Sequence, residues 1–149
     1  YEPVMLTDQL CCQAKEAGSF LASIAKTHCK SGKKLAYIAG GETVVNITGH
    51  GKGGRNQEIA LSAAEGIKGM SNAAVFSIGS DGTDGPTDAA GGYSDGDTAG
   101  VLKNKGIDIF EVLKNNDAYN ALKLTEGLII TGPTGTNVND VAVLLIDCD

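Results

Sequence analysis

Three glycine-rich loops carry the backbone and side-chain groups best suited to chemistry. They span residues 49–58, 80–88 and 132–140, and each follows an apolar run rich in β-branched residues. Glycine lets backbone N–H groups approach a ligand where a Cβ would collide. In an α/β sheet, the loops at the carboxyl ends of strands line the ligand crevice. Three such loops in 149 residues therefore predict one site that binds an anion or a metal.

The first loop predicts an anion site. Residues 49–54 follow the pattern G-x-G-x-x-G, and Arg55 opens the expected helix. A glycine turn at a helix N-terminus offers free N–H groups and a positive dipole end. The planar guanidinium of Arg55 matches carboxylate or phosphate oxygens. The alternative is that Arg55 pairs with a surface acid such as Glu58.

The same glycine pattern also occurs in dinucleotide-binding loops, so hydride transfer with NAD(P) is an alternative. In those loops an acidic residue follows about 20 residues later, at the end of the next strand. Here Ala74 occupies that position, and Asp81 comes late. The first loop therefore favours a general anion site over a dinucleotide site.

The second loop predicts a metal site. Asp81, Asp84 and Asp88 lie within eight residues, interleaved with small residues and with the hydroxyls of Thr83 and Thr87. Mg²⁺ usually takes one or two carboxylates together with waters and substrate phosphates. The alternative is that each aspartate caps a turn or the following helix.

The third loop resembles half of a P-loop but lacks its G-K-[ST] ending. No lysine follows to reach phosphates, so nucleotide binding of the Walker type is disfavoured. The loop still offers hydroxyls, amides and backbone N–H groups, and Asp140 adds a carboxylate or a cap.

Composition narrows the classes of partner. The net charge of −6 and pI near 4.8 disfavour nucleic-acid binding, which needs a basic surface. Four cysteines form no C-x-x-C pair and only two histidines occur, so a zinc site is disfavoured. We expect the cysteines to be reduced thiols in a reducing cytoplasm. No apolar run approaches the roughly 20 residues of a membrane span. The length fits one domain.

Hydrophobic periodicity predicts the elements that position these loops. An apolar stripe with helical spacing runs from Leu10 to His28. Further helices are expected after Arg55, at 98–105, at 109–114 with Asp108 as cap, and at 118–126 with Asp117 as cap. Strands are expected at 35–39, 43–48, 73–78, 128–131 and 141–146.

The alternation of these strands and helices predicts a three-layer α/β/α sandwich. The strand at 73–78 is continuously apolar, as expected for a strand covered on both faces. Adjacent strands near residues 40–41 indicate a mixed sheet, which we expect to be mainly parallel. Residues 1–34 form the leading strand and helix, and residues 35–147 form the core that carries the loops.

Four motifs together resemble the MOFRL domain of glycerate kinases. They are G-G-E-T at 40–43, G-G-R-N-Q-E at 53–58, D-G-T-D-G-P-T-D-A-A-G at 81–91 and T-G-P-T-G-T-N-V-N-D at 131–140. The match is specific because four motifs occur in the right order. It covers residues 35–146 closely and residues 1–34 loosely.

The resemblance implies a cytoplasmic enzyme that transfers the γ-phosphoryl group of ATP to D-glycerate, with 2-phosphoglycerate as the favoured product. It implies ATP and Mg²⁺ as cofactors, and Arg55 as the catalytic residue in a cleft between two α/β domains. The family's other important basic residue, a lysine, belongs to an N-terminal domain that precedes this segment. We therefore expect a two-domain protein whose isolated C-terminal domain is inactive, and a homo-oligomer is compatible with it.

The loops and the resemblance together give a set of candidate residues for binding substrate or phosphate. They are Gly51, Gly53, Gly54, Asn56, Glu58, Thr83, Thr134, Thr136 and Asn137, with Arg55 as the catalytic residue and Asp81, Asp84 and Asp88 as metal ligands. Two alternatives remain at this stage. One is a non-catalytic domain that binds an anionic metabolite, and the other is an NAD(P)-dependent hydroxypyruvate reductase.

Overall fold

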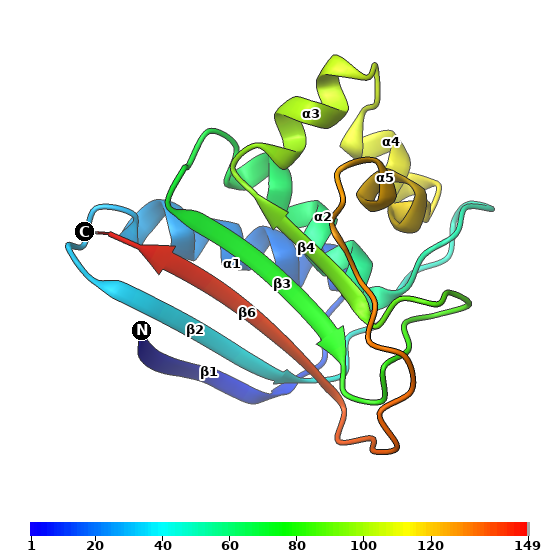
Figure 1. Cartoon of the computed structure of the whole chain (residues 1–149), viewed down its shortest axis with the longest axis horizontal. Coiled ribbons are helices and arrows are strands. Elements are labelled where there is room, and N and C mark those ends of the chain that lie inside the picture. The colour runs from blue at the N-terminus through cyan, green and yellow to red at the C-terminus, as the bar shows by residue number, and fades with distance from the viewer. Residues whose placement is uncertain (149) are drawn as a thin grey trace.

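The computed structural model describes residues 1–148 and contains one six-stranded sheet (Figure 1). The strand order is β1-β2-β6-β3-β4-β5. The strands are β1 (Glu2–Leu10), β2 (Lys34–Gly41), β3 (Ala73–Gly79), β4 (Gly91–Asp95), β5 (Leu128–Ile129) and β6 (Asp140–Asp147).

The sheet is mixed, as expected, but the prediction that it is mainly parallel is wrong. Only β1 and β2 run parallel, and every other pair is antiparallel. The C-terminal strand β6 inserts between β2 and β3 and runs against both. In addition, β3 connects to β4 through a loop without a helix, and such a connection joins antiparallel strands.

The helices pack on one face of the sheet (Figure 1). Alanines of α1 (Ala14–His28) and Ile59 of α2 (Arg55–Gly66) bury Val75, Leu144 and Ile146 of the central strands. The opposite side of α2 packs against α3 (Thr98–Asn104), α4 (Ile109–Lys114) and α5 (Ala118–Leu124) through a second apolar cluster. Within residues 1–148, no helix has the length and hydropathy that a membrane crossing requires.

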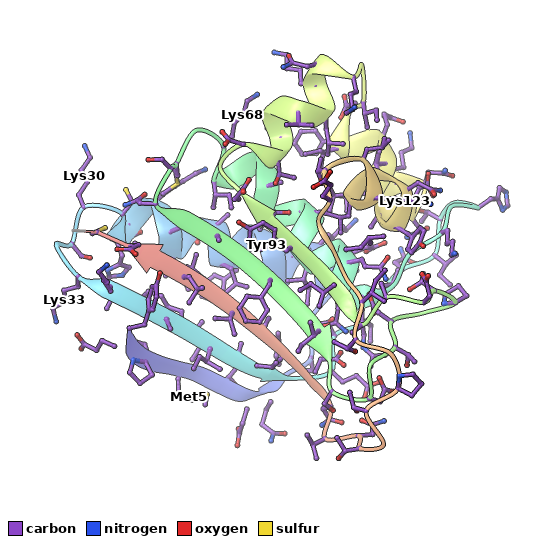
Figure 2. All side chains as sticks on the ribbon, in the orientation of Figure 1. Met5, Lys30, Lys33, Lys68, Tyr93 and Lys123 are labelled. Carbon is purple, nitrogen blue, oxygen red and sulfur yellow. The ribbon has the colours of Figure 1, made fainter. Side chains whose placement is uncertain are left out.

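The opposite face of the sheet carries no helix in the described part of the chain, so the three-layer prediction is wrong for this segment (Figure 1). The side chains of Phe76, Ile78 and Leu145 on that face are half-buried. Met5 and Tyr93 are exposed there (Figure 2). The continuous apolar pattern of β3 thus arises from one packed face and one open apolar face.

Several element boundaries differ from the prediction. The segment at 43–48 forms no strand, and its only ladder contact is the bridge between Gln13 and Val44. The first helix begins at Ala14 and not at Leu10, because Leu10 is the last residue of β1. Strand β4 was not predicted, because it begins with two glycines and so lacks the apolar pattern of a strand. A Cβ on Gly91 would lie 1.8 Å from the carbonyl oxygen of Ser77, so glycine is needed for β4 to pair with β3.

The sheet register brings the loops to one rim. Asp140, the first residue of β6, pairs with Gly41 at the end of β2 and with Gly79 at the end of β3. The segments that follow β2 and β3 and the segment that precedes β6 therefore leave the sheet at the same edge. The predicted meeting of the three loops at one edge of the sheet is confirmed.

Candidate functional site

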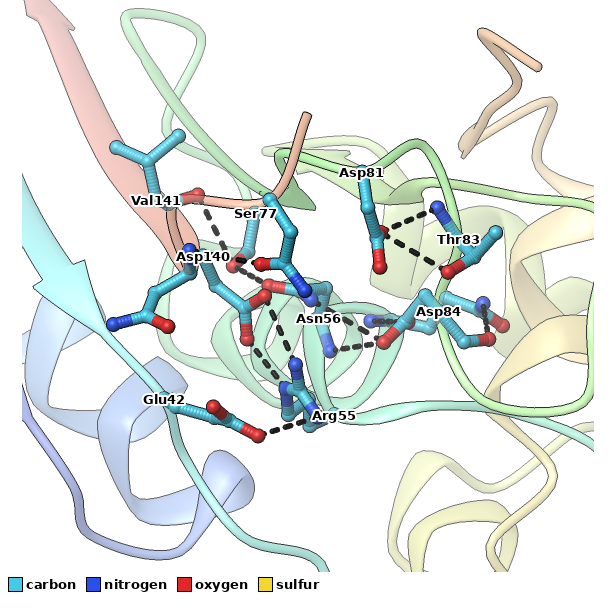
Figure 3. A network of polar contacts seen from close by, with 12 residues as sticks. Glu42, Arg55, Asn56, Ser77, Asp81, Thr83, Asp84, Asp140 and Val141 are labelled. Carbon is cyan, nitrogen blue, oxygen red and sulfur yellow. Dashed lines mark hydrogen bonds and ion pairs between the residues drawn. The ribbon is translucent and has the colours of Figure 1, made fainter. Parts of the chain in front are cut away.

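Arg55 lies at the centre of this rim and is held by two carboxylates (Figure 3). Its Nε and Nη2 atoms both donate to Asp140, the latter at 3.1 Å to Oδ1. Its Nη1 lies 3.2 Å from Oε1 of Glu42, just beyond β2. The hydrogen bond to Asp140 raises the pKa of Arg55 above its ordinary value, although burial opposes this shift. Arg55 does not pair with Glu58, but the alternative that it pairs with a surface acid is confirmed with the exposed Glu42 as the partner.

The N-terminus of α2, which positions Arg55, is capped by Asp84 from the second loop. The Asp84 carboxylate accepts hydrogen bonds from the backbone N–H groups of Asn56 (3.1 Å) and Gln57 (2.9 Å). A Cβ on Gly54 would lie 2.4 Å from Cγ of Asp84, which explains the glycine before the helix. Burial raises the pKa of Asp84, and the hydrogen bonds from Gln57 and Asn56 oppose that shift.

Asn56 is a structural residue, which corrects its prediction as a ligand. Its side chain is fully buried, and its Nδ2 donates to Oδ1 of Asp84 at 3.3 Å. Its Oδ1 accepts a hydrogen bond of 2.6 Å from the hydroxyl of Ser77 on β3. Both ends of the amide are thus used inside the protein (Figure 3).

The three aspartates of the second loop do not form the predicted joint metal site. Asp81 accepts from the backbone N–H (2.9 Å) and the hydroxyl (3.0 Å) of Thr83, and these bonds lower the pKa of Asp81. Asp88 accepts from the Tyr119 hydroxyl at 2.8 Å, and Asp84 caps α2. Among the described residues, no group of three His, Cys, Asp or Glu side chains could hold a metal ion.

The first loop is held mainly by the turn between α4 and α5. Asn115 and Asn116 accept hydrogen bonds from the backbone N–H groups of residues 48–51, and Asp117 accepts from that of Lys52. A Cβ on Gly51 would lie 2.4 Å from Cβ of Asp117. Gly51 is therefore needed for close packing, while its role as a ligand residue stays a prediction. No strand precedes this loop, so the dinucleotide alternative loses the context it needs.

The next two glycines of this loop differ from Gly51. The backbone N–H groups of Gly53 and Gly54 donate no hydrogen bond to any acceptor within residues 1–148. Both residues line the cavity beside Arg55. They retain donors that a ligand anion could use.

The third loop packs on the second loop and joins the same rim. The Thr134 N–H donates to the Asp81 carbonyl at 3.1 Å, and the Thr134 hydroxyl donates to the Ser80 carbonyl. Asn137 is exposed, and its Oδ1 accepts from the N–H of Asn139. Thr136 is exposed as well. The structure brings these predicted residues to the rim but not to the lining of the cavity beside Arg55.

A cavity of about 460 Å³ lies between the segment after β2, the start of α2 and the turn before α5. Val44, Val45, Ile47 and Pro86 form its apolar side. Its polar lining comes from Glu42, Thr43, Arg55, Glu58 and Asn116, together with the glycines at 49, 51, 53, 54 and 85. The mixture of apolar wall and convergent polar groups is typical of a small-molecule site.

Sequence reasoning missed the roles of Glu42, Asn116 and the turn at 115–117. Glu42 lies in the G-G-E-T motif, which carried a resemblance but no assigned chemistry. Asn116 adopts a left-handed backbone conformation, with φ of 56°. The pair Asn115-Asn116 was a signal available in the sequence, because asparagine tolerates such conformations in turns.

The site combines an arginine, carboxylates and unused backbone N–H groups at a helix N-terminus in an α/β domain, an arrangement suited to binding small anions. Comparison with known proteins is more specific. The model of the MOFRL family matches residues 35–140, and the chain belongs to that family. The resemblance read from the four motifs is thereby confirmed.

Individual relatives agree with this assignment. The chain is 56% identical over 146 residues to D-glycerate 2-kinase of Thermotoga maritima, and 46% identical over 151 positions to glycerate 2-kinase of Pyrococcus horikoshii. These matches cover 95% and 98% of the chain but 35% and 34% of the relatives. The crystal structure of Thermotoga maritima glycerate kinase matches with a TM-score of 0.94 at 54% identity, covering 99% of this chain and 36% of that one. The chain thus spans about a third of the length of these curated relatives.

Proposed function

We propose that this chain is the C-terminal domain of a glycerate 2-kinase, which transfers the γ-phosphoryl group of ATP to D-glycerate. The observation that carries the proposal is the position of Arg55 at a cavity that also presents the free N–H groups of Gly53 and Gly54. The names of the relatives support the choice of substrate. The enzyme is proposed to act in the cytoplasm.

Phosphoryl transfer depends mainly on positioning and on neutralising the charge of the migrating group. The guanidinium of Arg55 has five N–H donors, of which Asp140 and Glu42 engage three. The remaining donors and the two glycine N–H groups serve the glycerate carboxylate or the transferred phosphoryl group. The Glu42 side chain is 57% exposed, so its ion pair with Arg55 is weaker than that of Asp140. An incoming anion would therefore displace Glu42 from Arg55.

A magnesium ion bound by Asp81 alone agrees better with the geometry than an ion bound jointly by Asp81, Asp84 and Asp88. A Cβ on Gly79 would lie 2.6 Å from the carbonyl oxygen of Thr83 and 3.2 Å from Oδ1 of Asp81, so glycine lets the second loop pack closely against the end of β3. Asp140 is engaged by Arg55. Asp81 would therefore be the protein carboxylate for Mg²⁺, with water and ATP oxygens completing its coordination. The ion would neutralise phosphate charge.

The remaining part of the cleft is proposed to come from a second domain, because the relatives are about three times as long as this chain. That domain would supply the lysine that the family resemblance implies. The residues of the present chain would then bind and orient one side of the reacting groups.

The experiment is an assay of the full-length protein with ATP, Mg²⁺ and D-glycerate, in which ³¹P NMR identifies the product. We expect ADP and 2-phosphoglycerate. Absence of ATP-dependent phosphoglycerate would contradict the proposal. Calorimetry of the present chain alone with D-glycerate tests the alternative, since tight binding without turnover by the full-length protein would favour a non-catalytic binding domain.

A further inference from the structure

Glu58 lies one turn into α2 and lines the same cavity as Arg55, Gly53 and Gly54. Glu58 is only 4% exposed to solvent. Acidic residues are rarely this buried unless they are paired. No cation lies within ion-pair distance of Glu58 among the described residues. Its burial therefore needs a reason other than an ion pair.

One oxygen of this carboxylate is fixed and the other is unused. Oε1 of Glu58 accepts a hydrogen bond of 2.9 Å from Nδ2 of Asn116. Asn116 is itself immobilised, because its Oδ1 accepts from the backbone N–H groups of Thr48 and Gly49. Oε2 of Glu58 accepts no hydrogen bond from any described residue. The structure thus holds one carboxylate oxygen in a defined orientation with free acceptor capacity at the cavity.

The surrounding groups make this carboxylate a stronger proton acceptor than an ordinary glutamate. Burial raises the pKa of Glu58 above its ordinary value, and the charge of Asp84 raises it further. The hydrogen bond from Asn116 and the charge of Lys15 on α1 oppose the shift. General bases work best when their pKa lies near the working pH.

We infer that Glu58 is the general base that takes the proton from the attacking hydroxyl of the substrate. This assignment rests on the proposed kinase function. The hydroxyl oxygen forms a bond to the γ-phosphorus of ATP, while the bond from that phosphorus to the β,γ-bridging oxygen breaks. ADP leaves with the electron pair, the hydroxyl proton moves to Oε2 of Glu58, and water later removes it. Arg55 and the N–H groups of Gly53 and Gly54, which line the same cavity, bind the negative charge of the reacting groups.

The test uses Glu58→Gln in the full-length protein, with Glu65→Gln on the same helix as a matched control. Glutamine keeps the size of the side chain and can still accept from Asn116, but it cannot take a proton. Glu65 does not line this cavity. For Glu58→Gln, we expect kcat to fall about 10²–10⁴-fold and the KM for D-glycerate to change less than about threefold. Glu65→Gln should retain wild-type kcat.

The pH profile separates proton transfer from a purely structural role. In the wild type, log kcat should fall with a slope of one on the acid side, and Glu58→Gln should lack this limb. Wild-type kcat in Glu58→Gln, or an unchanged acid limb, would overturn the assignment while leaving the kinase function intact. If the variant does not fold, a wild-type kcat that is constant from pH 4.5 to 8 would overturn it. Absence of glycerate phosphorylation by the wild type would instead overturn the proposed function, and the assignment with it.

Discussion

Asp140 holds Arg55 through two nitrogen atoms of the guanidinium, although 85 positions separate the two residues in the chain. Asp140 is the first residue of β6, and Arg55 is the first residue of α2. The contact therefore joins the sheet rim to the helix whose N-terminus faces the cavity. The side chain of Asp140 is 7% exposed, so this carboxylate depends on Arg55 for its neutralisation.

Replacing Asp140 with asparagine should destabilise the protein. An amide offers one acceptor oxygen where the carboxylate offers two and carries no charge, and hydrogen bonds to charged groups contribute about 1.5–3 kcal/mol. We expect the free energy of unfolding to fall by about that amount, measured by urea denaturation. Glu42→Gln is the control, because the exposed Glu42 pair should contribute less than about 1 kcal/mol. Equal losses for both variants would contradict the proposed importance of the Asp140 contact.

Asp84 and Asp88 should differ sharply in their effect on stability. Asp84→Ala removes the carboxylate that accepts two backbone N–H groups of α2, and loss of an N-cap costs about 0.5–2 kcal/mol. Asp88 is exposed and accepts a hydrogen bond from the Tyr119 hydroxyl, so Asp88→Ala should cost less than about 0.5 kcal/mol. Thermal unfolding of the two variants measures the difference. A larger loss of stability for Asp88→Ala than for Asp84→Ala would contradict the assignment of Asp84 as the cap of α2.

Much of the fold was predictable because most elements have a clear local pattern. The helix from Arg55 and the strands at 35–39, 73–78 and 141–146 were found within a few residues. The cap at Asp108 was also found, and its carboxylate accepts from the N–H of Phe110. Strand direction was not predictable from periodicity, because it depends on where β6 inserts in the sheet.

The open face of the sheet shows a second limit of pattern reading. Phe76 and Leu145 give the central strands a continuous apolar pattern, which normally indicates cover on both faces. The described chain covers only one of these faces. An apolar sequence pattern indicates that a face of the sheet is hydrophobic, but it does not identify the segment that covers that face.

The site was predicted at the level of its loops and less well at the level of its side chains. The motifs identified Arg55 and the rim, because glycine-rich turns and a helix N-terminus leave local signals. They did not separate ligand residues from structural ones, since the roles of Asn56 and Asp84 depend on Ser77 and on the packing of a distant loop. Only tertiary structure establishes these contacts.

Glu58→Gln should change the pH dependence of stability in a defined direction. The pKa of Glu58 is raised in the folded protein, so the folded state keeps this proton to higher pH than the unfolded state does. Wild-type stability should therefore decrease as the pH rises from the ordinary pKa of a glutamate to the raised pKa of Glu58. The variant should lack this decrease and be at least as stable as the wild type at pH 7.

Urea denaturation of both proteins between pH 4 and pH 8 makes this comparison. A wild-type protein that becomes more stable relative to the variant as the pH rises would contradict the raised pKa. Glu65→Gln serves here too as the control for loss of a charge on the same helix, because Glu65 does not line this cavity.

The most direct measurement of the central claim is the glycerate kinase activity of Arg55→Lys in the full-length protein. A lysine ammonium cannot hold Asp140 through two nitrogens and still present planar donors to an anion. We predict that kcat/KM falls about 10²–10⁵-fold, while circular dichroism shows a folded protein. Lys52→Gln is the control, because Lys52 lies over the Tyr119 ring and does not line the cavity. Wild-type kcat and KM in Arg55→Lys would contradict the claim that this arginine anchors the site.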